Sequence, residues 1–132
     1  MPGCVLRASG DHFDPQGFLN DSAFVPCIVF RKGERKAENR LWTTSGFTVV
    51  VSDASGDDLA QQTQDATEFL RMHKEEVARL MRFEGIEGVD LDFGVNRQNG
   101  FLQSSHLPPE LLTLAGALGV GVEVSIYGDD ES

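Results

Sequence analysis

Two acidic clusters are the residues of this 132-residue chain best suited to chemistry. Asp11, His12 and Asp14 follow an apolar run at the point where a helix begins, and such side chains can hold a metal ion or move a proton. Asp90 and Asp92 alternate along a later apolar run, which places both carboxylates on one strand face, about 7 Å apart. Carboxylates so spaced can share Mg²⁺ or Ca²⁺, or divide the roles of general acid and general base.

Both clusters also have simpler structural interpretations. Asp14 precedes Pro15, so its side chain is expected to cap a helix N-terminus, while Asp11 is expected in a turn. The alternation of Asp90 and Asp92 is typical of a strand with one wet face. Because those two lack an evident His or Cys companion, we predict no metal and no cofactor. The candidate ligand-binding residues are Asp11, His12, Asp14, Asp90 and Asp92.

Charge is distributed unevenly along the chain. The formal net charge is −10 and the sequence pI is about 4.6, which disfavours nucleic acids and anionic membranes, since both attract Lys and Arg. Segment 31–40 instead carries five basic against two acidic side chains, a local balance of +3. This segment is expected either to contact an anion or acidic partner, or to be a solvated hairpin end that protects a sheet edge. Its basic residues are Arg31, Lys32, Arg35, Lys36 and Arg40.

The pattern of apolar residues predicts the elements that position these side chains. Strands are expected at 4–9, 25–31, 47–52, 86–95 and 120–127, with a further short strand at 101–103. Helices are expected at 14–21, from 57 or 58 to about 82, and at 107–118. The strand at 25–31 is apolar enough to be central, and the longest helix has a candidate break at His73–Lys74. The apolar face of that helix is expected to comprise Leu59, Ala66, Phe69, Leu70, His73, Val77, Leu80 and Met81.

This order of elements predicts an α+β fold. We expect one two-layer domain over 1–132, with a mixed, mainly antiparallel sheet of five to six strands, helices on one face and a frayed acidic tail at 128–132. Cys4 and Cys27 lie in apolar runs, so both are expected to be free and buried. Two thiols without a secretion signal, and no run of about 18 apolar residues, predict a cytoplasmic protein without membrane contact.

Short motifs spread over almost the whole chain carry a family resemblance. They are LRASGDHFDP at 6–15, SGF at 45–47, LDFG at 91–94, PELL at 109–112 and SIY at 125–127. With these motifs the chain resembles a family of small uncharacterised bacterial proteins of the domain-of-unknown-function type. Such chains open with a strand and Gly-Asp and close with a helix and a Ser-hydrophobic-Tyr strand. The resemblance implies an immunity-like or regulatory role and brings no catalytic residues with it.

These observations favour a non-enzymatic binding or regulatory module that contacts a protein partner or a second copy of itself. No Gly-rich phosphate loop, nucleophile elbow or Cys/His metal set occurs, and the adjacent residues of 104–106 (SSH) do not fix a geometry for nucleophilic attack. Two alternatives stay open. One is a small-anion or ligand sensor that uses the wet sheet face and the basic segment. The other is a small metal-dependent hydrolase, which requires the candidate carboxylates to converge in one pocket.

Overall fold

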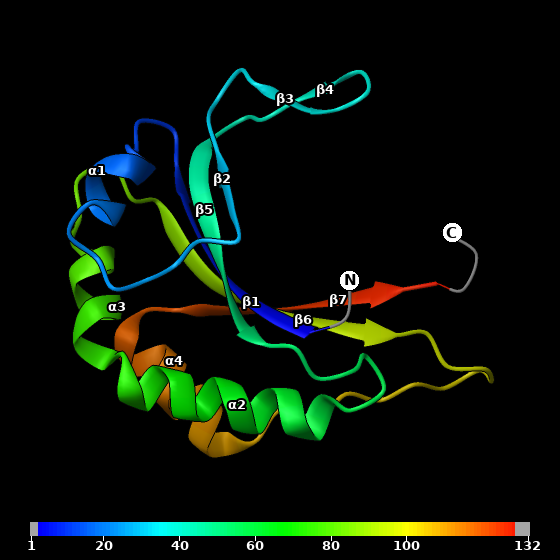
Figure 1. Ribbon diagram of the computed structural model, residues 1–132. Coiled ribbons are helices and arrows are strands. Elements are labelled where there is room, and N and C mark those ends of the chain that lie inside the picture. Colours follow the sequence, from blue (N-terminus) through cyan, green and yellow to red (C-terminus); the bar gives the residue numbers. More distant parts are fainter. Residues whose placement is uncertain (1–2, 129–132) are drawn as a thin grey trace.

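The computed structural model describes residues 3–128 and contains one five-stranded sheet (Figure 1). Its strand order is β2–β5–β1–β6–β7, and every pairing is antiparallel except the parallel pair β6–β7. The predicted mixed, mainly antiparallel sheet is therefore confirmed. The strands are β1 (Gly3–Gly10), β2 (Ile28–Phe30), β5 (Ser45–Ser52), β6 (Gly88–Asn96) and β7 (Gly121–Tyr127).

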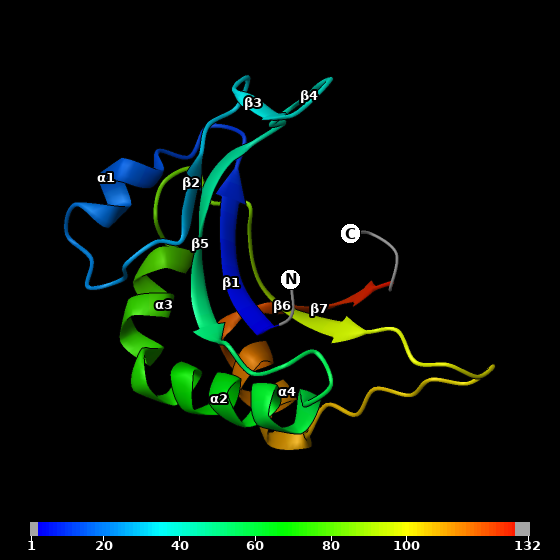
Figure 2. The ribbon, with the colours of Figure 1, turned by 45° about the vertical axis from the view of Figure 1, so that its right-hand side comes forward.

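The helices gather on one face of this sheet, as predicted for the α+β class (Figures 1 and 2). A separate two-stranded hairpin, β3 (Arg35–Ala37) and β4 (Arg40–Leu41), stands beyond one end of the sheet. The core fills the space between sheet and helices, and its fully buried members include Leu6, Phe47, Leu70, Leu91 and Phe93. The helices are α1 (Pro15–Leu19), α2 (Leu59–Met72), α3 (Lys74–Met81) and α4 (Pro109–Leu118).

The short helix α1 is held in place by aromatic packing rather than by its own hydrogen bonds. A five-residue helix is too short to be stable alone. Phe18 supplies the missing free energy, because its buried ring stacks on Phe47 at a centroid distance of 5.8 Å and meets Phe83 edge-on at 5.4 Å. The Arg79 guanidinium covers the same ring at 4.1 Å. These contacts fix the segment that follows β1 against the rest of the fold.

The long helix divides at His73, the candidate break, which ends α2 and precedes α3. Its backbone still makes helical hydrogen bonds: His73 N donates to Phe69 O and His73 O accepts from Val77 N, both at 2.9 Å. Its imidazole lies 4.5 Å from the Phe69 ring and 5.5 Å from the Phe24 ring, between centroids. His73 therefore packs among aromatic rings at the bend between the two helices.

Two strand predictions are wrong. The segment 25–31 is not central: β2 has only three residues and lies at the sheet edge, where Pro26 has no N–H to donate and the side chain of Val25 is exposed. The segment 101–103 forms no strand: it follows Gly100, which has a positive φ of 113°, and the side chain of Phe101 is fully exposed. Of the predicted tail at 128–132, all but residue 128 lies outside the described residues.

The two cysteines have different surroundings, which corrects the prediction that both are buried. Both are free; Cys4 lies in the core, but Cys27 is exposed just before the edge strand β2. Burial, followed by the nearby carboxylates of Asp92 and Asp65, raises the pKa of the Cys4 thiol well above its ordinary value. Cys4 is therefore a protonated, inert thiol at neutral pH.

We expect one thiol of the native protein to react rapidly with Ellman's reagent and the second to react only on unfolding. Cys27 is the fast one because it is exposed, and Cys4 is the slow one because it is buried and protonated. Thiol titration with and without denaturant measures both. Two fast thiols would contradict the burial of Cys4, and fewer than two thiols in denaturant without reductant would reveal a disulfide.

Candidate functional site

The face of the sheet turned away from the helices is covered by none of the helices in the described part of the chain (Figure 2). We call it the open face. It is formed by the side chains that alternate with the core residues along each strand, so the pairing of the strands decides which of them are neighbours. They are Val5, Arg7, Ile28, Thr48, Val50, Asp90, Asp92, Glu123, Ser125 and Tyr127.

A fixed polar network occupies the middle of the open face. Arg7 Nη2 donates to Asp92 Oδ2 at 3.0 Å, and Ser125 Oγ donates to Asp92 Oδ1 at 2.7 Å. A second nitrogen, Arg7 Nη1, lies 3.9 Å from Glu123 Oε1. The Asp92 side chain is only 11% exposed, so its two oxygens exchange water for these donors. Three strands thereby hold one carboxylate in a single orientation.

Apolar side chains flank this network around a hollow of about 420 Å³. Val50 on β5 is 51% exposed and Ile28 on β2 is 49% exposed, while Val5 and Tyr127 complete the apolar lining. These exposed aliphatic and aromatic groups supply apolar area of the kind that a protein partner buries, with polar groups beside it.

The hairpin β3–β4 leans out at one end of the open face in both views (Figures 1 and 2). Its position is set by Trp42, which stacks on Phe30 with 4.0 Å between ring centroids and carries the Lys36 ammonium 4.8 Å from its ring. Phe30 in turn lies over Gly46, where an added Cβ would come within 2.7 Å of the ring. Segment 31–40 is exposed throughout, and it therefore presents a basic rim beside the open face.

The acidic cluster at the end of β1 lies against the basic segment instead of forming a metal site. Lys32 Nζ binds Asp11 Oδ1 at 2.7 Å, and Arg31 Nη1 lies 3.6 Å from Asp14 Oδ1. The hydrogen bond from Lys32 and its charge lower the pKa of Asp11. His12 is 3.7 Å from Asp11 Oδ2 and is otherwise in solvent. Across residues 3–128 no group of three His, Cys, Asp or Glu side chains is arranged to hold a metal ion.

The simpler interpretation of this cluster is only partly right. Asp14 occupies the N-cap position of α1, but its side chain makes no capping hydrogen bond and lies over Gly17. The turn at Asp11 is stabilised by its backbone N–H, since Asp11 N donates to Glu87 Oε1 at 3.1 Å.

On the open face, the Asp90 carboxylate lies over Gly121, where an added Cβ would collide with it. The five candidate acid and His residues are thus not brought into one pocket.

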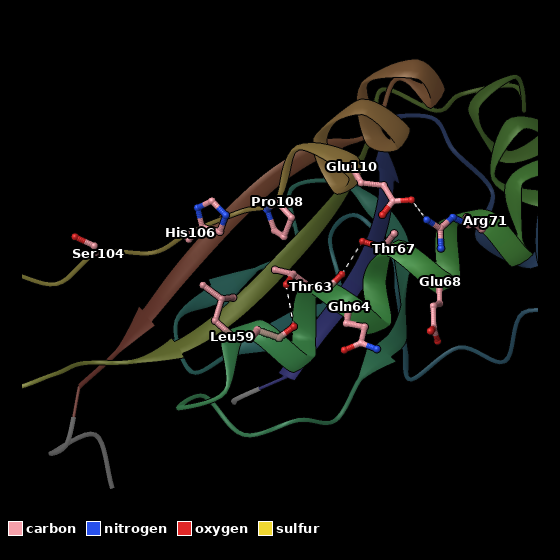
Figure 3. Close-up of a pocket in the computed structure, with 11 residues that line it drawn as sticks. Leu59, Thr63, Gln64, Thr67, Glu68, Arg71, Ser104, His106, Pro108 and Glu110 are labelled. Carbon is pink, nitrogen blue, oxygen red and sulfur yellow. Dashed lines mark hydrogen bonds and ion pairs between the residues drawn. The ribbon is translucent and has the colours of Figure 1, made fainter.

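A second hollow, of about 590 Å³, runs between α2 and the segment that leads into α4 (Figure 3). An ion pair between Arg71 and Glu110 links the two helices at one end of it. The hydroxyls on its floor are already used within α2, because Thr63 Oγ1 donates to Ala60 O at 3.0 Å and Thr67 Oγ1 to Thr63 O at 2.8 Å. Glu68, Ser104 and His106 also line this hollow, but among the described residues no hydrogen bond joins their side chains to one another.

Sequence reasoning found Asp92 but missed the residues that engage it. Arg7 and Ser125 both occupy outward positions of alternating strands, and that alternation is visible in segments 4–9 and 121–127. The alternation along each strand therefore indicates on which face of the sheet each of these side chains lies. Which outward residues become neighbours depends on the strand order, and that order is not written in either segment alone.

Comparison of the chain with protein-family models, with curated proteins and with solved structures finds no match. Among the helices that the structure describes, none is both long and apolar enough to cross a membrane.

Proposed function

We propose that this chain is a non-enzymatic binding module of the immunity type that holds a basic protein partner on its open face. The observation that carries the proposal is the polar network of Arg7, Asp92 and Ser125 at the centre of a sheet face that no helix within residues 3–128 covers. Fixed polar groups determine the orientation of a partner, and the exposed apolar groups around them supply the area to be buried.

The charge of the open face supports a basic partner. On the strands of the open face, Asp90, Asp92 and Glu123 stand against the single cation Arg7. The basic segment at one end of the face carries +3, and the rest of the chain carries −13. A surface of one sign raises the rate at which an oppositely charged protein associates. The affinity for such a partner should therefore fall as the salt concentration rises.

The chemistry of the face favours binding over catalysis. Asp92 is held by hydrogen bonds from Arg7 and Ser125 and its side chain is only 11% exposed, which disfavours its use as a general base. The other acidic cluster, at Asp11, is neutralised by Lys32. The proposal extends to a bacterial, cytoplasmic protein that binds no nucleic acid, because the family resemblance, the two free thiols and the acidic charge all agree with it.

The test compares two arginine substitutions at exposed apolar positions on opposite sides of the molecule. Val50→Arg places a bulky cation beside the polar network of the open face, whereas Met72→Arg places it at the end of α2, among the helices. Proteins encoded by the genes adjacent to this one are co-expressed with each form, and binding is measured by calorimetry. We expect Val50→Arg to weaken binding at least tenfold, because it removes shape and charge complementarity at once.

Met72→Arg is the matched control, and it should bind as the unmodified chain does. Thermal unfolding of both variants checks that each is folded. Equal loss of binding in the two variants would place the interface elsewhere, and binding to none of the adjacent products would contradict the immunity-type role. If the unmodified chain turned over a substrate and the Asp92→Asn variant did not, the protein would be an enzyme and the proposal would be wrong.

A further inference from the structure

The outer edge of β7 pairs with no strand in the described part of the chain. The direction of its backbone groups follows from one hydrogen bond: Tyr127 O accepts from Arg97 N at 2.8 Å, so the backbone of Tyr127 points toward β6. Backbone groups of successive strand residues point to opposite sides. Val122, Val124 and Ile126 therefore direct their N–H and C=O groups away from the sheet.

This edge lacks the features that usually prevent strands from pairing between molecules. Such features are Lys or Pro on the strand, a bulge, or a very short strand. β7 has seven residues in uninterrupted register with β6, and Glu123 is its single charged residue. The opposite edge is protected, because β2 is three residues long and follows Pro26 closely. One edge of the sheet is thus closed to pairing and the other is open.

We propose that β7 pairs antiparallel with β7 of a second copy, centred on Val124, and joins the two sheets into one. In this register Val124 lies opposite its own copy, and Val122 lies opposite Ile126 of the second copy. Val122, Val124 and Ile126, whose backbone groups point away from β6, then form hydrogen-bonded pairs. Each exchanges two backbone hydrogen bonds with its partner residue. No other centre of symmetry on this strand uses the three of them together.

The side chains of the strand are complementary to themselves in this register. On the helix side, β-branched residues meet one another, and the pairing covers Ile126, which is 53% exposed in the single chain. On the open face, Glu123 lies opposite Ser125, so no like charges lie directly opposite each other across the junction even though each chain carries −10. Tyr127 lies opposite Gly121, whose bare backbone its ring can cover.

Helix α4 extends the same interface into the helix layer. Glu110 pairs with Arg71 of α2, and positions two apart on a helix project about 200° apart, so Leu112 faces away from α2. Leu112 is 45% exposed, and Gly116, one turn on, has no atom within 4 Å of a Cβ built on it. Since α4 also contacts β7, a second copy paired along β7 approaches this face and adds area beyond the strand edge.

Sedimentation of the full chain tests the pairing. We expect a mass near twice 14.4 kDa that falls toward a single chain on about hundredfold dilution. Val124→Pro removes one outward N–H and leaves the bonds to β6 in place, so it should give a folded single chain. Val124→Thr keeps the N–H and the branched shape, and it should remain a dimer. Ile126→Lys, at an exposed position, is a second disrupting variant that does not alter the backbone.

Hydrogen exchange identifies the surface that is used. In the dimer the amides of Val122, Val124 and Ile126 should exchange slowly, and in Ile126→Lys they should exchange at least tenfold faster while β1 and β6 stay protected. A single chain at all concentrations overturns the proposal. A dimer in which these amides remain unprotected, or which survives both disrupting variants, also overturns it. Because Val50 lies on the open face and away from this edge, loss of partner binding in Val50→Arg leaves the dimer intact, so the two proposals can fail separately.

Discussion

Phe18→Ala is expected to lower the free energy of unfolding by about 3–5 kcal/mol. The Phe18 ring is fully buried and contacts Phe47, Phe83 and the Arg79 guanidinium, so its removal opens a cavity between α1, the sheet and α3. The five-residue helix α1 also loses the contact that holds it on the core. Chemical denaturation followed by circular dichroism measures the loss.

Phe101→Ala is the matched control, because it deletes the same ring from a side chain that is fully exposed. Its free energy of unfolding should stay within about 0.5 kcal/mol of that of the unmodified chain. An equal effect of the two substitutions would mean that the helix at Pro15–Leu19 does not pack on the sheet as the structure has it.

Gly10→Ala is expected to lower the free energy of unfolding by about 3 kcal/mol, the upper part of the usual range for overpacking, because the added methyl group meets backbone rather than a movable side chain. A Cβ on Gly10 would come within 1.9 Å of Gly85 O and 3.2 Å of Glu87 N. Gly85 itself has a φ of +91° and lies against the backbone of His12 and Phe13. The two glycines allow the end of β1 and the approach to β6 to touch, which also places the cluster at Asp11.

Gly88→Ala tests whether that cost is specific. Gly88 is a strand residue beside Ser9, but a Cβ built on it meets nothing closer than Asp90 Oδ2, at 3.8 Å. This substitution should change the melting temperature little, since there is space for the methyl group and the backbone is ordinary. Equal melting temperatures of the Gly10→Ala and Gly88→Ala variants would refute the close approach of the two backbone segments.

Much of the fold follows from local patterns. Alternation along 4–9 predicts a strand with one inward face, and Leu6 and Ala8 are indeed buried while Arg7 faces outward. Helical spacing predicts one long helix over the residues of α2 and α3, and its length makes His73–Lys74 a candidate break, which is where the two helices separate. The spacing was less reliable for the buried face of α2, where the polar residues Gln62, Thr63 and Thr67 are buried and Phe69 is only partly covered.

Gln62 shows why the pattern of polarity alone does not give the buried face. Its side-chain amide donates to the carbonyls of Ser55 and Gly94, at 3.0 and 2.9 Å, and so ties the loop before α2 to β6. A buried polar side chain of this kind is stabilised by partners that are distant in the sequence. No count of apolar residues on a helix wheel reveals those partners.

The sequence by itself determined the class of fold, most of the helices and long strands, the acidic balance and the two charged clusters, because each depends on neighbours along the chain. Only the tertiary structure decided which outward side chains meet. Arg7 and Asp92 are 85 residues apart, and they touch because β1 pairs with β6; Lys32 reaches Asp11 because β2 lies at the edge beside β5. Strand order depends on contacts between residues far apart in the chain, so the composition of the open face and the position of β7 at the sheet edge are defined only in the folded structure.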